Sequence, residues 1–452
     1  MTTAAQTVPV PKPRFFYGWI ILFACFNVTT MASGTMMAFG VFINPLADAM
    51  GWSHSALSFT YALSAIVSGI GVLFVGSYLN TYSLRQIFMW SALVHGFGIY
   101  MASTAQTIEA FYFWYGFVAA LGRSAFFIST TTLITRWFET RRGLVMGIMM
   151  AGNGVGPFFF SPLVTWLIYM WDWQTAFVVL SLTLATAMML SCLLIRNHPH
   201  EMGLLPYGRS SEPVRPLQPT SRGAVPSPPA RPKTGALWGE VLRLEGFWSI
   251  SAINFFCCVC HSIPLVHIVG FAQHAGLSAF TSAWVLSLMS VSSIVGRVYW
   301  GIFADRHGSS FALVITLFMQ GALVLWLVNT QDPAVFIVYA LVWGFGYGGV
   351  GTQYGVVSRE VFGARLFGPA YAGQNCFAMV GMAVGGFLGG YLFDISHDYT
   401  TAWLVSFAAG LISSLIAMDL LAQRDRAQSV QIQTPQASAQ PAVPVSSTPV
   451  NV

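Results

Sequence analysis

The sequence predicts an all-α membrane protein in which twelve transmembrane helices form two bundles of six. Of the 452 residues, 55% are hydrophobic and only 8% are charged. A soluble domain carries about 25% charged residues. The apolar residues also gather in runs of about 20, the length that crosses a bilayer as a helix. These observations exclude a soluble globular domain, and only six cysteines in so long a chain exclude a disulfide scaffold.

The apolar runs divide the chain into an N-terminal bundle over residues 16–195 and a C-terminal bundle over residues 247–422. Strands of a β-barrel would instead show short segments of alternating apolar and polar residues, which this sequence lacks. The individual spans are predicted at residues 16–43, 54–78, 85–103, 108–135, 143–169, 174–195, 247–273, 280–304, 310–329, 333–358, 368–393 and 400–422.

Polar segments flank and separate the two bundles. Residues 1–15 are predicted to be a cytoplasmic N-terminal segment without a cleavable signal peptide, because the apolar run that follows is too long. Residues 196–246 are a Pro/Arg-rich cytoplasmic linker, extended apart from a short amphipathic helix near residues 238–244. The Gln/Pro/Ala/Ser-rich residues 423–452 are predicted to be a disordered cytoplasmic tail.

The basic residues predict that both termini face the cytoplasm, because Lys and Arg gather in the cytoplasmic loops of membrane proteins. With the N-terminus inside, the cytoplasmic segments hold Lys12, Arg14, Arg85, Arg136, Arg141, Arg142, Arg196, Arg209, Arg215, Arg222, Arg231, Lys233, Arg243, Arg306, Arg359, Arg365, Arg424 and Arg426. The outer loops and their borders hold acids, which are Asp48, Glu109, Asp172, Asp332, Asp394 and Asp398. The formal charge of +5 therefore reflects the basic residues that set the orientation in the membrane. No nucleic-acid partner is expected.

Related motifs recur in the two halves. Gly76 and Gly301 are 225 residues apart, and so are Gly143 and Gly368. A repeat of six helices is typical of two-bundle secondary transporters.

The motif after span eight resembles the loop signature of the major facilitator superfamily, and the resemblance covers nearly the whole chain. The motif is Gly301-x-x-x-Asp305-Arg306-x-Gly308. In the first half the corresponding loop is degenerate, with Asn80 where the acid is usual.

A second motif is more specific. It is Trp137-Phe138-x-x-Arg141-Arg142-Gly143-x-x-x-Gly147, and it is similar to the fifth-helix signature of monocarboxylate transporters and oxalate/formate antiporter-like proteins. The opening Tyr17-Gly18-Trp19 of span one fits the same branch. The resemblance implies a transporter of the cell (inner or plasma) membrane, with two six-helix bundles and both termini cytoplasmic.

These motifs imply gating roles rather than a substrate site. In the superfamily, the loop that here holds Asp305 and Arg306 locks the outward-facing state, although both could be solvated loop charges. Arg141 and Arg142 could act only to set the orientation of the chain in the membrane. Glycines spaced by four, such as Gly143 and Gly147, let another backbone approach closely, and the packing could be static or could permit sliding.

Two arginines, Arg123 in span four and Arg297 in span eight, lie well inside the predicted spans. A buried arginine costs ~2.5–3.5 kcal/mol on the insertion scale, so it normally faces a partner or a water-filled cavity. No deeply buried Asp or Glu is present to neutralise either residue. The missing counter-charge is therefore expected to be a mobile anion, and a carboxylate suits the guanidinium fork.

The resemblance supports Arg297, since Ser292-Ser293-Ile-Val-Gly-Arg297 is similar to the eighth-helix segment whose arginine pairs with the substrate carboxylate in monocarboxylate transporters. Two departures weaken proton coupling: Ser293 replaces the aspartate of the animal members, and span one has no lysine. Arg297 could instead be a gate residue that snorkels to the cytoplasm. Arg123 could be a structural brace or a substrate contact.

Neutral polar residues complete the predicted site. His267 can accept a proton near physiological pH, although a lone membrane histidine is more often a packing residue. Asn27 and Tyr347 are further candidates for the cavity lining, against the alternative of interhelical hydrogen bonds. His95 and His261 are weaker candidates.

The sequence thus predicts a monomeric secondary transporter of small organic anions, most simply monocarboxylates, by alternating access. Its expected partners are a small carboxylate, protons and the lipid bilayer, with no cofactor and no metal. Proton symport and anion exchange both stay open. Alternatives are a drug or organic-cation exporter of the same superfamily and a transporter-like sensor. No constellation of residues supports an enzyme.

Overall fold

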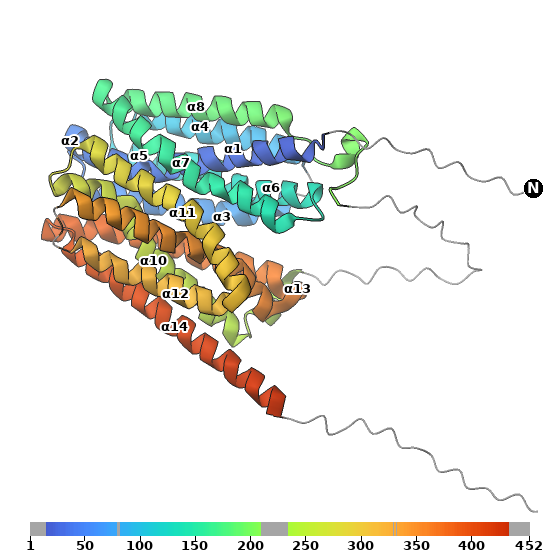
Figure 1. The fold of residues 1–452 in the computed structure, drawn as a ribbon. Coiled ribbons are helices and arrows are strands. Elements are labelled where there is room, and N and C mark those ends of the chain that lie inside the picture. The colour runs from blue at the N-terminus through green and yellow to red at the C-terminus, as the bar shows by residue number, and fades with distance from the viewer. Residues whose placement is uncertain (1–14, 79–81, 209–233, 329, 331, 434–452) are drawn as a thin grey trace, which may run out of the picture.

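The computed structural model describes residues 15–78, 82–208, 234–328, 330 and 332–433, and every main element in these ranges is helical. Figure 1 shows the helices side by side, with the start of α1 and the end of α14 toward the same side of the molecule. The N-terminal bundle contains α1 (Gly18–Met37), α2 (Phe39–Met50), α3 (His54–Tyr78), α4 (Leu84–Ala102), α5 (Ile108–Phe111), the π-helical η1 (Tyr112–Ala119), α6 (Ala120–Trp137), α7 (Arg142–Met170) and α8 (Trp173–Leu194).

The C-terminal bundle follows the linker. It contains α10 (Glu245–His274), α11 (Ala279–His307), α12 (Ser309–Leu323) with the short 3-10 helix η3 (Val324–Leu327), α13 (Pro333–Ser396) and α14 (Thr400–Gln433). The helix α13 includes two predicted spans, which meet at Gly363, where φ is +62°. Glycine accepts this left-handed conformation without steric cost, so the chain can turn back there.

Among the described residues, eleven helical stretches are long and apolar enough to cross a membrane. The predicted third span corresponds to α4, which is not one of the eleven. It nevertheless packs inside the N-terminal bundle, where a Cβ on Gly98 would lie 2.5 Å from the backbone nitrogen of Ala119.

Two helices extend past their predicted ends. The first span is predicted to end at residue 43, but α2 continues to Met50. The helix α14 continues to Gln433, beyond residue 423, where the sequence predicts the disordered tail to begin. The rest of that predicted tail, residues 434–452, and the central linker residues 209–233 lie outside the described residues.

The two ends of the linker pack on different bundles. Tyr207 joins the turn between α6 and α7, because its N–H donates to the Trp137 carbonyl at 2.9 Å. At the other end, α9 (Thr234–Val241) packs on α13, where Trp238 lies beside Gly373 and Glu240 pairs with Arg365. The predicted short helix therefore begins a few residues earlier than expected and lies against protein.

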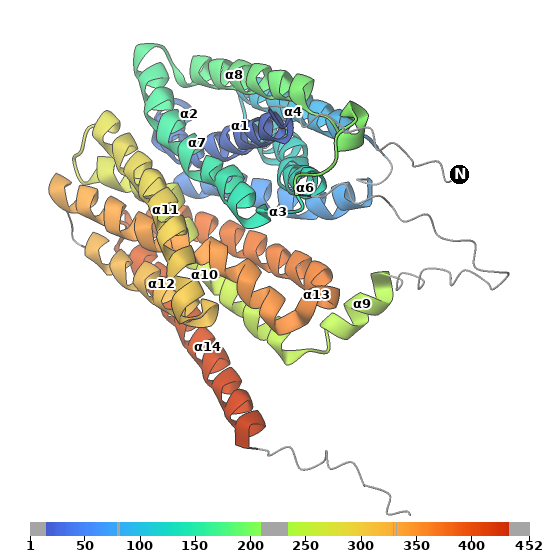
Figure 2. The same cartoon turned by 45° about the vertical axis from the view of Figure 1, so that its right-hand side comes forward.

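Closely packed glycines hold neighbouring helices together. A Cβ on Gly156 of α7 would lie 2.3 Å from the Thr30 carbonyl oxygen of α1, and one on Gly385 of α13 would lie 2.5 Å from the Val259 carbonyl oxygen of α10. The bundles themselves meet where α7 lies along α11, as Figure 2 shows, and where α3 lies along α13. Gly154 fits against Ile294 at the first of these interfaces.

Candidate substrate cavity

A cavity of about 160 Å³ lies among α10, α11 and both halves of α13. In the predicted orientation its lining comes mainly from the middle and the cytoplasmic halves of these helices. None of the lining residues is acidic, and the guanidinium of Arg297 is the permanent charge among them. They are Asn254, Cys258, His261, Arg297, Tyr347, Gly348, Val350, Gly351, Tyr354, Tyr371, Asn375 and Ala378.

Arg297 reaches this cavity from α11 and is half-buried. Its Nη1 donates a hydrogen bond to the carbonyl oxygen of Met150 on α7, in the other bundle. A guanidinium has five N–H donors, and a carbonyl oxygen carries no full negative charge. Arg297 therefore supplies positive potential at the boundary between the bundles, as the sequence predicts for an anion site.

Aromatic packing holds Tyr347 beside Arg297. Its ring stacks on Trp343 with centroids 5.2 Å apart and an interplanar angle of 11°. On its other side it meets the ring of His261 edge to face, with centroids 5.1 Å apart. Of the predicted substrate residues, the structure thus brings Arg297 and Tyr347 together in one cavity.

Arg123 lies in the other bundle, and α3 braces it. Its Nη2 donates to the hydroxyl of Ser64 at 2.8 Å, to the carbonyl of Ser64 at 3.2 Å and to the hydroxyl of Ser68 at 3.0 Å. These bonds fit the interpretation of Arg123 as a structural brace between helices. Tyr61 lies close enough to interact electrostatically with both Arg123 and Tyr347, so the brace stands near the boundary between the bundles.

His267 and Asn27 lie outside the cavity lining. The Nε2 of His267 is 2.9 Å from the carbonyl oxygen of Gly386, which ties α10 to α13 within the C-terminal bundle. The amide of Asn27 donates to the Ala187 carbonyl at 3.0 Å and to the Ser191 hydroxyl at 2.8 Å, which ties α1 to α8. Both residues make the interhelical bonds that were the alternative to substrate contact.

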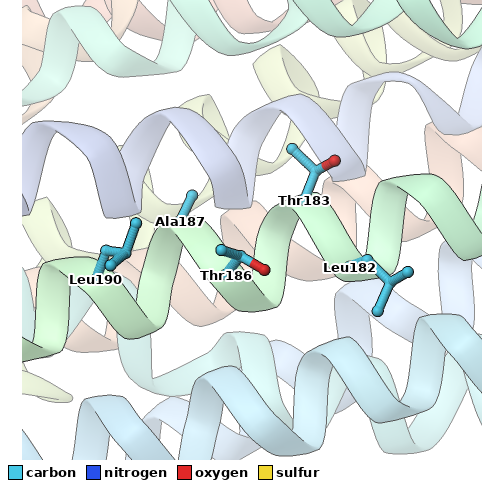
Figure 3. A pocket seen from close by; sticks show the side chains of 5 residues that line it. All are labelled: Leu182, Thr183, Thr186, Ala187 and Leu190. Carbon is cyan, nitrogen blue, oxygen red and sulfur yellow. The ribbon is translucent and has the colours of Figure 1, made fainter.

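A second hollow lies along the exposed face of α8. Figure 3 shows its lining by Leu182, Thr183, Thr186, Ala187 and Leu190. It has no charged side chain, and its leucines are exposed on the outer surface of a membrane-spanning helix. A lipid-facing groove accounts for these properties, so we assign it no substrate.

Comparison with known proteins decides the family. The model of the Major Facilitator Superfamily matches residues 22–362 and 263–448. The chain belongs to the major facilitator superfamily. Its relatives place it in the monocarboxylate transporter-like branch: rat monocarboxylate transporter 13 is 26% identical, with 89% of each chain covered. Rat monocarboxylate transporter 4 is 24% identical over 90% of this chain and 84% of its own.

Solved structures show the same fold at low sequence identity. The nucleoside transporter NupG has a TM-score of 0.68 and 11% identity, over 89% of this chain and 99% of its own. A bacterial homologue of the human lysosomal transporter Spinster, in an inward-facing and unoccupied conformation, has a TM-score of 0.64 and 12% identity, over 91% of this chain and 96% of its own. The protein is thus a multi-pass transporter of the cell membrane and not an enzyme.

The superfamily loop lies at the end of α11. Gly308, with φ at +95°, ends α11 and begins α12, while Asp305 and Arg306 are exposed. The hydroxyl of Ser309 donates to the carboxylate of Glu360 at 2.7 Å, which joins this loop to the inner end of the tenth span. No atom of the described residues lies within 4 Å of the place of a Cβ on Gly301, so none of the described helices packs closely on it.

The fifth-helix motif contains both loosely and tightly packed glycines. Arg141 precedes α7 with φ at +56°, a conformation that is uncommon for residues with a Cβ. Gly147 has no atom within 4 Å of the place of a Cβ, whereas Gly152, Gly154 and Gly156 further along α7 are tightly packed. The side chain of Arg142 and the surroundings of Gly143 lie outside the described part.

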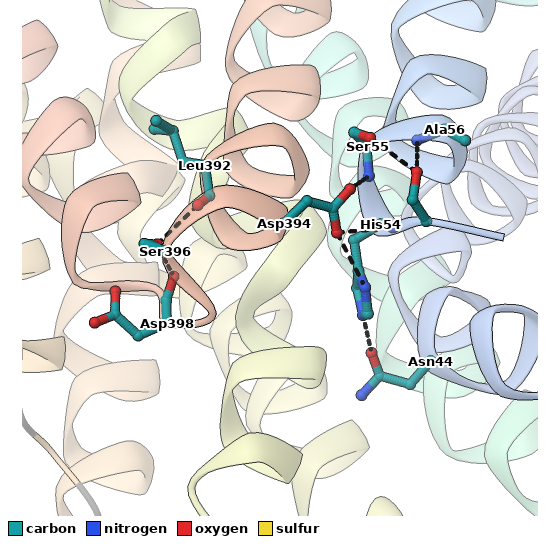
Figure 4. A network of polar contacts seen from close by, with 9 residues as sticks. Asn44, His54, Ser55, Ala56, Leu392, Asp394, Ser396 and Asp398 are labelled. Atoms are coloured by element: carbon teal, nitrogen blue, oxygen red, sulfur yellow. Dashed lines mark hydrogen bonds and ion pairs between the residues drawn. The ribbon is translucent and has the colours of Figure 1, made fainter. Parts of the chain in front are cut away.

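A polar network joins the bundles at their outer ends (Figure 4). The carboxylate of Asp394 accepts the backbone N–H groups of His54 and Ser55 at 3.2 and 2.7 Å, and the ring nitrogen Nδ1 of His54 lies 3.6 Å from it. Asn44 Oδ1 lies 3.1 Å from the other ring nitrogen of His54, and the Asn44 amide donates to Gln273 at 2.6 Å. An acid of α13 therefore caps the first turn of α3 across the interface.

The cavity also contains residues that sequence reasoning passed over or ranked low. Asn254 and Tyr371 are lining residues that no motif singles out, and His261 takes the place beside Arg297 that was expected of His267. The available signal is the polarity of these residues within apolar spans, which does not reveal the direction that each side chain faces.

Proposed function

We propose that this transporter moves small organic anions, most simply monocarboxylates, and that Arg297 binds the carboxylate. The observation that carries the proposal is a half-buried arginine in a cavity whose lining has no acid. An anion in that cavity supplies the missing counter-charge, and two parallel N–H donors of a guanidinium match the two oxygens of a carboxylate. The printed names of the relatives, monocarboxylate transporters 13 and 4, support the same class.

Alternating access accounts for the arrangement of the bundles. The Asp394 network closes the outer ends, while the cavity lies toward the predicted cytoplasmic side. We therefore assign this conformation as inward-facing, in a twelve-span protein whose third span is α4 and whose termini are both cytoplasmic. Rocking of the bundles about the cavity would open the outer side and close the inner one.

Arg123 is proposed to assist from the other bundle by adding positive potential. The gating role falls to the superfamily loop at Asp305 and Arg306 and to the α7 motif. Either proton symport or anion exchange would satisfy the charge balance, because a carboxylate enters with a proton or leaves against another anion.

The test is uptake and counterflow in proteoliposomes with lactate, pyruvate, formate, oxalate and larger acids, with and without a pH gradient. The Arg297→Lys variant keeps the charge but loses the planar fork, so transport should fall by about tenfold or more if a bidentate bond is lost. Arg85→Lys, at an exposed position in the first turn of α4, is the matched control and should transport normally.

Two results would count against the proposal. One is transport of a lipophilic cation with no carboxylate movement, which would favour a cation exporter of the same superfamily. The other is unchanged counterflow in a well-folded Arg297→Lys variant, which would remove Arg297 from the site.

A further inference from the structure

His261 lies on the wall of the cavity that Arg297 also lines, and the side-chain partners of both its ring nitrogens are weak. Nδ1 is 3.4 Å from the amide nitrogen of Gln320 and 3.7 Å from the Cys257 sulfur. Nε2 is 3.1 Å from the thioether sulfur of Met382. Thiols and thioethers are poor hydrogen-bond partners, so the side chains around the ring do not fix its protonation.

We propose that His261 binds the proton that accompanies the carboxylate, so that Arg297 holds the anion and His261 holds the proton in one cavity. The inference rests on the proposed function, since it concerns the ion that moves with the same substrate. No covalent step is involved: a proton adds to an imidazole nitrogen on one side of the membrane and leaves it on the other.

The surroundings of His261 contain an acceptor that suits its protonated form. The side-chain oxygen Oε1 of Gln320 is buried and has no hydrogen-bond partner in the described structure. A buried acceptor without a partner costs about 1–3 kcal/mol. If the amide rotates, its nitrogen leaves the Cys257 carbonyl, 3.3 Å away, and Oε1 turns toward the ring. In the protonated ring both nitrogens carry an N–H, so Nδ1 can then donate to Oε1.

The other titratable or charged groups around His261 are poor proton carriers near neutral pH. From α12, the neighbouring group is the neutral amide of Gln320. Thiols and phenols release their protons only at higher pH, and a guanidinium stays charged. These groups are Cys257 and Cys258 from α10, Arg297 from α11, and Tyr347 and Tyr354 from α13. No carboxylate is among them, so the imidazole is the side chain of this group whose ordinary pKa lies nearest to neutral.

Electrostatics would couple the proton to the anion. In the empty cavity the permanent charge of Arg297 would disfavour a second positive charge on His261, which lines the same cavity. A bound carboxylate neutralises Arg297 and adds a negative charge near the ring, so the proton affinity of His261 rises. By linkage, protonation of His261 strengthens anion binding by the same factor. Anion and proton would therefore bind and leave together.

His267 provides a matched control on the same helix. It is also a buried histidine of α10, but its Nε2 contacts a backbone carbonyl and its ring lies outside the cavity lining. A glutamine keeps hydrogen-bonding capacity and cannot titrate. His261→Gln and His267→Gln therefore make the same chemical change at a cavity position and at a packing position.

The experiment compares two assays of one carboxylate in proteoliposomes, with protein-free vesicles as background. Uptake driven by an inward proton gradient requires proton coupling, whereas counterflow at equal pH does not. We expect His261→Gln to lose gradient-driven uptake by about tenfold, within the usual range of coupling between two sites, while counterflow at saturating carboxylate persists. His267→Gln should retain both.

Gln320→Met provides an independent second variant, which removes the acceptor for protonated Nδ1. It should move the half-maximal pH of uptake to a lower value. Gradient-driven uptake at the wild-type level in His261→Gln, or an unchanged pH profile in Gln320→Met, would overturn the inference. Wild-type counterflow without any response to the pH gradient would overturn it too and leave the proposed function standing. Absence of wild-type carboxylate counterflow would overturn the proposed function itself.

Discussion

At the residue scale, the ring and the hydroxyl of Tyr347 can be tested separately, the ring for packing and the hydroxyl for substrate binding. The Tyr347 ring packs on Trp343 and His261, and the residue also lines the cavity that holds Arg297. Tyr347→Phe keeps the ring contacts and removes only the hydroxyl. If that hydroxyl donates to the carboxylate, the lost bond is worth about 1.5–3 kcal/mol, and half-maximal uptake should need about tenfold more substrate or above.

Tyr339 supplies the matched control for this prediction. It is fully buried, packs on the same Trp343 with ring centroids 6.0 Å apart, and has a hydroxyl without a partner in the described structure. Tyr339→Phe should therefore leave uptake unchanged and should not lower thermal stability. Equal uptake curves for both variants would show that the Tyr347 hydroxyl does not contact the substrate.

At the element scale, α7 contains glycines in two different environments. A Cβ on Gly156 would collide with the backbone of α1, so Gly156→Ala should cost ~1–3 kcal/mol of stability through overpacking. A Cβ on Gly147 would meet open space, so Gly147→Ala should melt like the parent protein in detergent. A lower melting temperature for Gly147→Ala alone would contradict this packing.

Helix bounds were predictable because the bilayer sets the length of each apolar run. The direction that each side chain faces could not be predicted from the sequence. Surfaces that face lipid and surfaces that face neighbouring helices are both apolar, so the hydrophobic pattern does not mark the inner face. His261 and His267 show the consequence: six residues apart on α10, they face different sides of the helix, and only the first reaches the cavity.

Arg123 and Arg297 show how much of the candidate site could be predicted from buried charges alone. Without a buried acid to pair with, both were predicted to face a cavity or a structural partner. Arg297 lies in the cavity, whereas Ser64 and Ser68 of α3 hold Arg123. The serines are ordinary helix residues in the sequence, and only the packing of α3 against α6 makes them partners of a guanidinium. Sequence reasoning therefore kept brace and substrate contact open for Arg123.

At the scale of the whole molecule, we expect the Asp394 network to determine which side of the transporter is closed. Asp394 belongs to one bundle and caps α3 of the other, so its bonds exist only while the outer ends are together. Interactions made in one state alone shift the equilibrium toward that state. Asp394→Ala should therefore increase the fraction of molecules that open outward.

Ser58, one turn further along α3, can report that opening. It is fully buried against Gly390 of the opposite bundle, so a Ser58→Cys reporter should react with an impermeant maleimide only when the outer ends part. Loss of the charge-assisted bonds of Asp394, ~1.5–3 kcal/mol for one bond, predicts labelling faster by about tenfold or more. Asp398→Ala is the matched control, because the Asp398 carboxylate accepts the N–H of Thr400 within its own bundle. Equal labelling rates in the two variants would mean that Asp394 does not hold the outer side closed.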